Sequence, residues 1–168
     1  MTHSAATAFI NHFLGSSHVF ASVVNEVVEE KLLRQVTRGC ISLSQFKLLK
    51  LLALTEACSI GDVAAFLGVS NAAASKTVDK LVRRKFLTRS EFPADRRAIE
   101  LALTERSRRL LRQYEILKTH QLNQLFHQFS PRELHRTAQL LYRLSARLVD
   151  HSPKPEQLCL QCGIYFRD

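Results

Sequence analysis

The sequence predicts a mainly α-helical protein with a small β-hairpin, arranged as a winged helix-turn-helix between long N- and C-terminal helices. Three observations lead to this prediction. Apolar residues recur at helical spacing at both ends of the chain. Residues 59–109 read as a short helix, a tight turn, a second helix and a basic hairpin, which is the order of parts in a winged helix-turn-helix. Positive charge is concentrated in that same stretch.

Length and composition are those of one compact globular unit with appended elements. The chain has 168 residues, of which 46% are hydrophobic and 23% are charged. No apolar run approaches the ~20 residues of a membrane span, and the N-terminus lacks the basic region of a signal peptide, so we expect a cytoplasmic protein. The chain divides into an N-terminal dimerisation helix at 1–40, a winged DNA-binding lobe at 41–104, C-terminal dimerisation helices at 105–150 and a cysteine-containing tail at 151–168.

Two helices are predicted ahead of the helix-turn-helix. From Phe9 to Val36 apolar residues come as doublets about four positions apart, which places them on one broad stripe of a long helix. The glycine and serines at 15–17 are expected to kink or restart that helix. A second helix is predicted to begin at Ser42, because Ser42 and Gln45 fit a capping box ahead of an apolar run.

Capping and turn residues define the helix-turn-helix itself. Ser59 and Asp62 predict a capped start for a supporting helix over residues 60–66. Gly68 ends this helix, because the turn requires a residue that tolerates a positive φ. Val69 is expected to pack between the two helices, and Ser70 is the expected cap of the second helix.

The second helix of the motif is the predicted DNA-reading helix. Ala74, Val78 and the pair Leu81/Val82 face inward at helical spacing, which leaves the N-terminal positions of the other face open to base edges. Alanines allow close approach to thymine methyls, asparagine can pair with adenine, and lysine can reach guanine or phosphate. Cations farther along the helix are expected to contact the DNA backbone. The predicted DNA-binding residues here are Ser70, Asn71, Ala72, Ala73, Ser75, Lys76, Lys80 and Arg83.

A basic hairpin follows the reading helix. The segments FLTRSE and AIELAL alternate apolar and polar residues as half-buried strands do, and FPADRR is expected to form the tip between them. Arg96 and Arg97 are cations suited to a narrow minor groove. Asp95 can brace one of them through a charge-assisted hydrogen bond. The hairpin therefore adds Asp95, Arg96 and Arg97 to the predicted DNA-binding residues.

Two C-terminal helices complete the predicted fold. Thr104 can cap a helix that runs to roughly Phe129, and Ser130 with Pro131 predicts the start of another that ends near Val149. The terminal helices are too apolar to stand alone, so we expect them to pack on one another and on a second chain. Closure into an intramolecular bundle is the alternative. A twofold dimer places two modules one helical turn apart on a palindrome.

The charge distribution indicates a polyanionic partner. The formal net charge is +9, and residues 76–112 alone carry 12 Lys/Arg against five Asp/Glu, a local excess of +7. Such a segment releases condensed counterions when it neutralises phosphates. A charged run is ordinarily a solvated face, but this one coincides with the helix-turn-helix. The sequence contains no acid–base or nucleophile constellation and no glycine-rich phosphate loop, so we expect no enzyme. Solvated helix faces are predicted for His120, His127 and His135.

These motifs resemble those of the MarR family of bacterial winged-helix regulators, and the order of parts is similar from about residue 8 to 150. The family's wing signature is matched by DRRAIELALT, and the segment ISLSQFKLLKLL is similar to its second helix. The signature of the reading helix is matched by Ser70, Ser75, Val78 and Leu81. Ser107 departs from the glycine that members often carry there, and it is expected merely to lengthen the helix.

The resemblance implies how such a protein works. It implies an obligate homodimer with interlocked N- and C-terminal helices that binds a pseudo-palindromic operator near its own promoter, usually as a repressor. It also implies a cleft between the dimerisation helices and the DNA-binding lobe, in which many members bind small phenolic or other effectors. The implied partners are therefore double-stranded DNA, a second copy of the chain and a small molecule.

The tail carries a Cys-x-x-Cys-Gly motif at Cys159 and Cys162, after a proline-containing linker. The motif resembles a zinc knuckle, which supplies two of the four ligands of a structural zinc. Two knuckles of a dimer can form a four-thiolate site for zinc or an iron–sulfur cluster. Alternatively, Cys40 and Cys58 complete a site within one subunit, or the tail pair forms a redox-active disulfide. Cys40 and Cys58 are otherwise expected to be buried small residues.

Two functional hypotheses follow. The first is a dimeric DNA-binding transcription regulator whose C-terminal cysteines bind a metal or sense redox state. The alternative is a metal-dependent protein-interaction adaptor whose winged domain binds protein. The arginines of the hairpin and the local excess of positive charge favour the first hypothesis.

Overall fold

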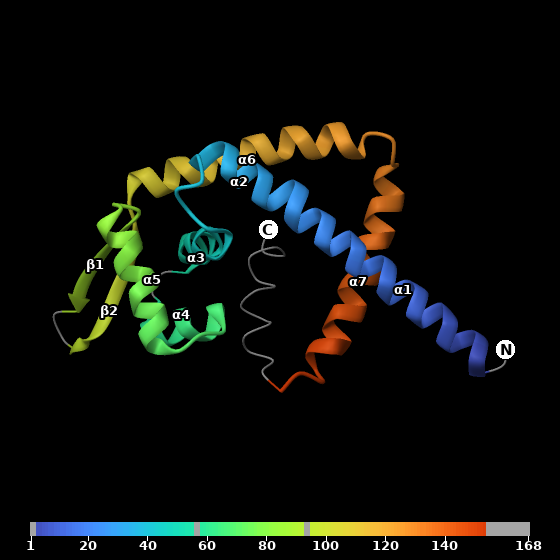
Figure 1. Cartoon of the computed structure of the whole chain (residues 1–168), viewed down its shortest axis with the longest axis horizontal. Helices are drawn as coiled ribbons and strands as arrows, with labels where there is room; N and C mark the ends of the chain where they lie inside the picture. The colour runs from blue at the N-terminus through green and yellow to red at the C-terminus, as the bar shows by residue number, and fades with distance from the viewer. Residues whose placement is uncertain (1–2, 56–57, 93–94, 154–168) are drawn as a thin grey trace. The chain divides into compact units, whose positions relative to one another are not determined.

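The computed structural model describes residues 3–55, 58–92 and 95–153, and it divides into two compact units, Met1–Leu43 and Ser44–Asp168. The first unit is helical nearly throughout. Three helical segments, α1 (His3–Val23), the π-helix η1 (Val24–Glu30) and α2 (Lys31–Thr37), follow one another directly (Figure 1). The long N-terminal helix predicted from apolar spacing is therefore present.

The irregularity in this helix lies elsewhere than predicted. The expected kink or restart at 15–17 is wrong, because α1 runs through these residues. A Cβ added to Gly15 would meet no atom within 4 Å, so this glycine lies on open helix surface. There it destabilises the helix only through its low helix propensity, by about 1 kcal/mol relative to alanine. The π-helical segment is instead rich in valine, whose β-branched side chains crowd the preceding turn. The helix ends at Arg38 (φ 51°) and Gly39 (φ 75°).

The apolar stripe of the first unit is buried at only one end. Leu32 and Leu33 of α2 are almost completely buried. Earlier in the unit Val28 is buried and Phe13 and Val24 are half-buried, but most large hydrophobic side chains are exposed, namely Phe9, Ile10, Leu14, Val19, Phe20, Val23 and Val27. Within the described chain, this stretch of helix therefore presents an apolar face to solvent.

The second unit contains the predicted helix-turn-helix and hairpin in the predicted order (Figure 1). Its elements are α3 (Leu43–Leu54), α4 (Ile60–Leu67), α5 (Asn71–Arg83), β1 (Leu87–Phe92), β2 (Asp95–Leu103), α6 (Glu105–Phe126) and α7 (Pro131–Val149). α3 begins directly after Ser42, as predicted, and α6 ends three residues before the predicted Phe129.

The two strands form an antiparallel hairpin. Leu87 lies opposite Leu103, and a bulge shifts the register between Glu91 and Phe92. Pairing continues beyond the bulge to Asp95, so β2 already begins there. The prediction of a six-residue tip is therefore wrong. Alternation of apolar and polar residues identifies the half-buried part of a strand, but it does not show where the pairing of the strands ends.

The core of the second unit is centred on α3. The rings of Phe46 on α3 and Tyr114 on α6 are 4.4 Å apart between centroids, and Lys50 forms an ion pair with Glu115 at 3.5 Å beside them. α3 is buried around most of its circumference, through Gln45, Phe46, Leu48, Leu49, Leu51 and Leu52. α6 therefore starts at the hairpin and contacts α3 through Tyr114 and Glu115.

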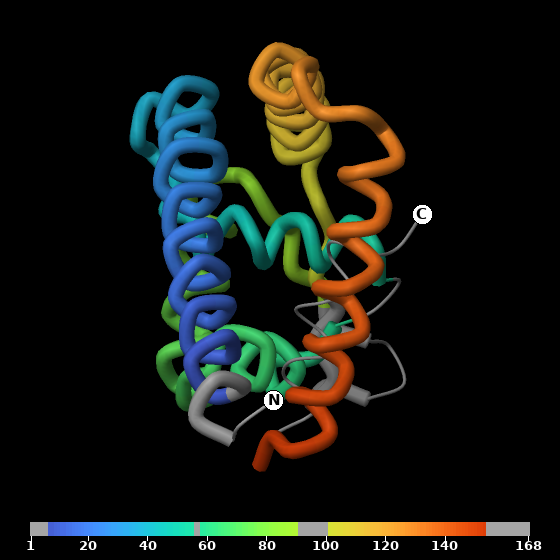
Figure 2. The backbone as a smooth tube through the Cα atoms, turned by 90° about the vertical axis from the view of Figure 1, so that its right-hand side faces the viewer, coloured from blue at the N-terminus to red at the C-terminus, as the bar shows by residue number. Residues whose placement is uncertain are grey.

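The last helix has a well-defined start but no buried side chain. The Ser130 N–H donates to Glu133 Oε2 (2.9 Å) and the Glu133 N–H donates to Ser130 Oγ (3.2 Å), which is the predicted cap. A hydrogen bond from the Ser130 hydroxyl to Glu133 Oε2 (2.6 Å), together with the one from the Ser130 N–H, holds the pKa of Glu133 below its usual value. Figure 2 shows the chain turning between α6 and α7. No residue of α7 is buried, and its exposed apolar side chains are Leu134, Leu140, Tyr142, Leu144 and Leu148.

The exposure of the histidines on the C-terminal helices can be compared with the prediction. The predicted exposure of His120, His127 and His135 is confirmed. In the ranges that the structure describes, every helix is too short or too polar to cross a bilayer.

Candidate nucleic-acid interface

The first helix of the motif, α4, is capped as predicted. Ser59 and Asp62 form a reciprocal capping box, in which the Ser59 N–H donates to Asp62 Oδ2 (2.8 Å) and the Asp62 N–H donates to Ser59 Oγ (3.1 Å). The Ser59 hydroxyl also donates to Asp62 Oδ2 (2.7 Å). These bonds satisfy N–H groups that the first turn of a helix leaves without an intrahelical partner. The start of α4 is therefore determined locally.

The turn between α4 and α5 confirms two predictions and corrects a third. Gly68 has φ 66°, as its role in ending α4 requires, and Ser70 Oγ accepts from the Ala73 N–H (3.3 Å) at the start of α5. The backbone N–H of Val69 donates to the Ala64 carbonyl (3.0 Å). Its side chain is 44% exposed, so the prediction that it packs between the helices is wrong. The backbone of Val69 closes the turn, while its side chain faces solvent.

Apolar packing orients α5. The contact between the two helices is made by buried side chains at helical spacing, which are Val63, Ala64 and Phe66 on α4 and Ala74, Val78 and Leu81 on α5. Val82, also expected to face inward, is half-buried. Because side chains three and four residues apart share one face of a helix, the opposite face of α5 is turned toward solvent.

The predicted reading residues lie on that outward face. Ser70, Asn71, Ala72, Lys76, Lys80 and Arg83 are exposed, and Ala73 and Ser75 are half-buried. The first turn thus combines two alanines with an asparagine, and the cations follow farther along the helix. This order suits a helix whose N-terminal end enters a major groove while its later side chains meet phosphates.

The hairpin is connected to the reading helix by an ion pair. Arg89 on β1 lies 3.3 Å from Asp79 on α5, between Nη1 and Oδ1. The backbones of Asp95, Arg96 and Arg97, the predicted DNA-binding residues of the hairpin, lie on β2 rather than in the tip. Their side chains lie outside the part of the structure that is described.

The turn from α5 into β1 carries a lysine in the left-handed region. The Lys85 N–H donates to the Val82 carbonyl (2.8 Å) and the Phe86 N–H donates to the Leu81 carbonyl (2.9 Å), which is the hydrogen-bond pattern of a Schellman motif. Lys85 has φ 59°, a conformation in which glycine is usual because a Cβ is strained there. The sequence signal for a helix end, a glycine, is absent here.

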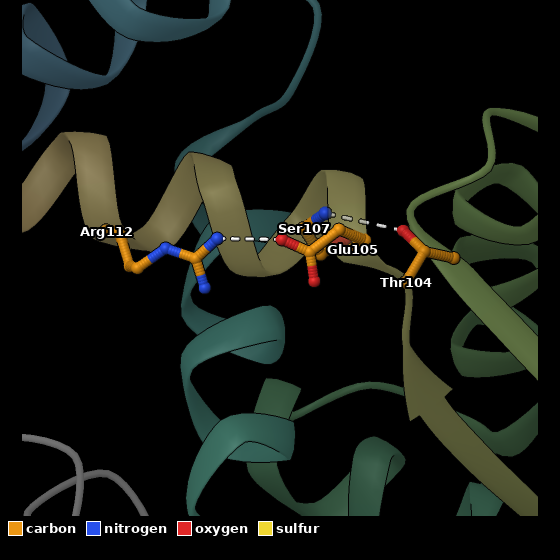
Figure 3. Close-up of polar contacts among 4 residues, drawn as sticks. All are labelled: Thr104, Glu105, Ser107 and Arg112. Carbon is orange, nitrogen blue, oxygen red and sulfur yellow. Dashed lines mark hydrogen bonds and ion pairs between the residues drawn. The ribbon is translucent and has the colours of Figure 1, made fainter.

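The first turn of α6 is hydrogen-bonded to this turn. Thr104 Oγ1 donates to the Lys85 carbonyl (2.8 Å), and the hydroxyl of Ser107 donates to the Phe86 carbonyl. Ser107 is completely buried, and its N–H donates to Thr104 Oγ1 at 3.3 Å (Figure 3). The expectation that Ser107 merely lengthens α6 is wrong, because its hydroxyl connects the helix to the base of the hairpin.

An ion pair lies on the solvent side of the same turn. Arg112 Nη2 is 2.7 Å from Glu105 Oε1 (Figure 3). The hydrogen bond from Arg112, with the nearby charges of Arg109 and Arg108, holds the pKa of Glu105 below its usual value. Sequence reasoning missed the roles of Lys85 and Ser107, since no local pattern indicates a contact between residues that are about twenty positions apart.

The two cysteines within the described residues differ in burial. Cys58 is buried and Cys40 is half-buried. No group of three or more His, Cys, Asp or Glu side chains is placed to hold a metal in the described ranges. The predicted metal ligands Cys159 and Cys162 lie outside these ranges.

We expect the Cys58 thiol to react slowly in the folded protein. Desolvation, with a smaller effect of Asp62, raises its pKa to about 11. At pH 8 its thiolate fraction is then about 100-fold below that of an ordinary cysteine. Since the folded state favours the neutral thiol, this group stabilises the fold below pH 9, and the effect is lost as the pH rises toward 11. Iodoacetamide labelling with peptide mapping measures the rate, and a rate equal to that in guanidinium would contradict burial.

Comparison with known proteins shows which family this architecture resembles. Residues 41–99 match the profile of the MarR family. The search of curated proteins found no similar sequence. RV1404 from Mycobacterium tuberculosis is 25% identical, with a TM-score of 0.70 over 80% of this chain and 92% of that one. FabT from Streptococcus pneumoniae, solved in complex with DNA, is 23% identical, with a TM-score of 0.70 and coverage of 87% and 99%.

A third relative is described as a regulated DNA-binding protein. BpsR from Bordetella bronchiseptica, whose DNA binding is regulated by 6-hydroxynicotinic acid, is 27% identical to this chain. Its TM-score is 0.54, over 77% of this chain and 91% of that one. The helices and hairpin described above thus have the winged-helix fold of the MarR family.

Proposed function

We propose that the protein is a homodimeric, sequence-specific DNA-binding regulator that represses transcription, and the match of residues 41–99 to the MarR family model supports this proposal. The observation that supports this most strongly is the outward face of α5, with small and polar residues at the N-terminal end and exposed cations behind them. α4 holds this face in place through apolar contacts. The DNA complex of FabT supports the same use of the fold.

The proposed homodimer is supported by apolar helix faces that a single chain leaves exposed. α7 buries none of its residues, although its apolar side chains recur at helical spacing. The exposed stripe of α1 is also apolar. Contiguous apolar surface of this kind marks an interaction site in a globular protein. A second copy, which brings a second reading helix, is the partner that a palindromic operator requires.

Selection of duplexes from a random library tests this function. Full-length protein immobilised through its N-terminus should enrich a pseudo-palindrome whose two halves are about one helical turn apart. Sedimentation of the complex should give two chains per duplex. A library that stays unenriched after repeated rounds would refute sequence-specific binding, and enrichment of a single half-site by one chain would refute the dimer.

Control by a small molecule belongs to the same proposal. It is supported by BpsR, whose DNA binding is regulated by 6-hydroxynicotinic acid. Addition of aromatic carboxylic acids to the selected complex, followed by anisotropy, tests whether a ligand of this class releases DNA.

We also propose that Cys159 and Cys162 bind zinc or an iron–sulfur cluster. Support comes from the spacing of two thiols before a glycine, a spacing typical of a zinc knuckle. Thiolates select zinc or iron–sulfur clusters over harder cations. Purification without oxygen, an absorption spectrum and metal analysis are the test, and we expect stoichiometric metal in the wild type and none in the Cys159→Ser/Cys162→Ser variant. Metal-free wild-type protein would refute a metal site and leave a thiol switch.

A further inference from the structure

A second group of cations lies at the far end of the reading helix. The junction cluster consists of Arg84 and Lys85 after α5 and of Arg106 and Arg109 on α6, all exposed. Arg106 Nη1 donates to the Arg84 carbonyl (2.9 Å), and its guanidinium lies 4.3 Å from the centroid of the Phe86 ring. Arg106 and Arg109 are three residues apart on α6 and therefore share a face. Tertiary contacts thus bring together four cations from two segments.

The junction cluster is exposed, and the acid that precedes Arg106 forms its ion pair with a cation outside the cluster, although its charge also acts on Arg109. That acid, Glu105, directs its side-chain hydrogen bond to Arg112 (2.7 Å). Lys85 places an exposed ammonium at a position with φ 59°, where glycine would avoid backbone strain. Thr104 and Ser107 hold the turn in place, since they bind the carbonyls of Lys85 and Phe86. Exposed guanidinium groups fit phosphate oxygens in pairs.

The cluster continues the line of cations on α5. Lys76, Lys80 and Arg83 follow at i, i+4 and i+7 on the outward face, and Arg84 stands at the end of the helix. α5 has 13 residues, so its length is about 20 Å, whereas the major groove is only about 12 Å wide. A helix of this length that crosses the groove with its N-terminal end at the bases extends past the groove edge, so its C-terminal end faces phosphates and not bases.

We propose that the junction cluster binds backbone phosphates of the same duplex outside the half-site that α5 reads. This inference rests on the proposed DNA-binding function. It assigns the cluster a sequence-independent role, because phosphates carry no base identity. The footprint of the protein is then longer than its recognition sequence, and the added affinity depends on salt.

The test compares two lengths of the duplex enriched by selection. One contains only the pseudo-palindrome, and the other adds about 10 bp of arbitrary sequence, one helical turn, on each side. We expect the full-length protein to bind the longer duplex on the order of tenfold more tightly at low salt. In the double variant Lys85→Gly/Arg109→Gln this advantage should disappear, and the salt slope on the longer duplex should fall by about 0.9 for each phosphate that the variant leaves unneutralised. Binding of the short duplex should stay unchanged.

Three controls make the result specific. Lys85→Gly relieves the left-handed strain, so the melting temperature should not fall. Lys85→Arg keeps the charge and should keep the length dependence. Arg132→Gln/Arg136→Gln removes two exposed charges from α7 and should leave binding to both duplexes unchanged.

Several outcomes would overturn the proposal. Equal weakening on both duplexes would place the cluster inside the operator. If the double variant binds both duplexes as tightly as the wild type does, DNA is not the ligand of the junction cluster. An acidic protein surface is then the remaining candidate. If selection enriches no duplex at all, the DNA-binding function itself fails, and this is distinguishable because it appears before any cluster variant is tested.

Discussion

Replacement of Ala72 by glutamate should reduce sequence-specific DNA binding by at least about 100-fold, because the new side chain places a carboxylate where α5 meets the groove. Ala72 is exposed in the first turn of α5. The fold should be unaffected, since an acidic residue near a helix N-terminus interacts favourably with the helix dipole. Anisotropy with the selected duplex measures the loss, and circular dichroism checks the fold.

A variant with the same charge change on another helix is the control for this experiment. Ala146→Glu introduces the same charge at an exposed position of α7 and should leave DNA binding unchanged. If Ala72→Glu binds the duplex as tightly as the wild type does, α5 is not the reading helix. The alternative of a protein-interaction adaptor then becomes the better explanation of the winged domain.

The double variant Leu144→Glu/Leu148→Glu should convert the proposed dimer to a monomer. Leu144 and Leu148 are 37% and 67% exposed in the single chain and lie four residues apart on α7. Burying two carboxylates in an apolar interface is strongly unfavourable. Binding to the palindrome should fall on the order of 100-fold or more, because the second half-site no longer binds as an intramolecular event. Sedimentation equilibrium and anisotropy measure the two effects.

The control for this variant is a charge on the same helix away from the apolar positions. Gln139→Glu adds one carboxylate at an exposed polar site of α7 and should remain dimeric. A Leu144→Glu/Leu148→Glu protein that sediments as a dimer would mean that α7 is not in the interface. The exposed stripe of α1 would then be the remaining candidate.

Local chemistry explains why so many elements could be predicted from the sequence. Ser59, Ser70, Thr104 and Ser130 were each predicted as helix caps, and each accepts the expected backbone N–H. A cap and its partner are three residues apart, so both are visible in the same short window of sequence. Gly68 belongs to the same class, because a positive φ at a helix end is a local requirement.

Predictions failed where the answer depended on contacts between distant residues or on competition between local signals. Val69 is apolar, yet its side chain is exposed because the space between α4 and α5 is already filled. The glycine and serines at 15–17 do not interrupt α1, because their low helix propensity is outweighed by the helical turns on both sides. The paired ends of the hairpin extend past the predicted strands, since register depends on both strands together.

By itself, the sequence determined the order of helices and hairpin, the capped start of each part of the helix-turn-helix and the outward face of α5. These features follow from interactions within a few residues, which a linear pattern contains. Only the tertiary structure decided that Ser107 bonds to the turn at Phe86, and that Arg106 donates to the Arg84 carbonyl beside the left-handed Lys85. The physical reason is that these contacts join residues about twenty positions apart, whose meeting is decided by the packing of α5, α6 and the hairpin together.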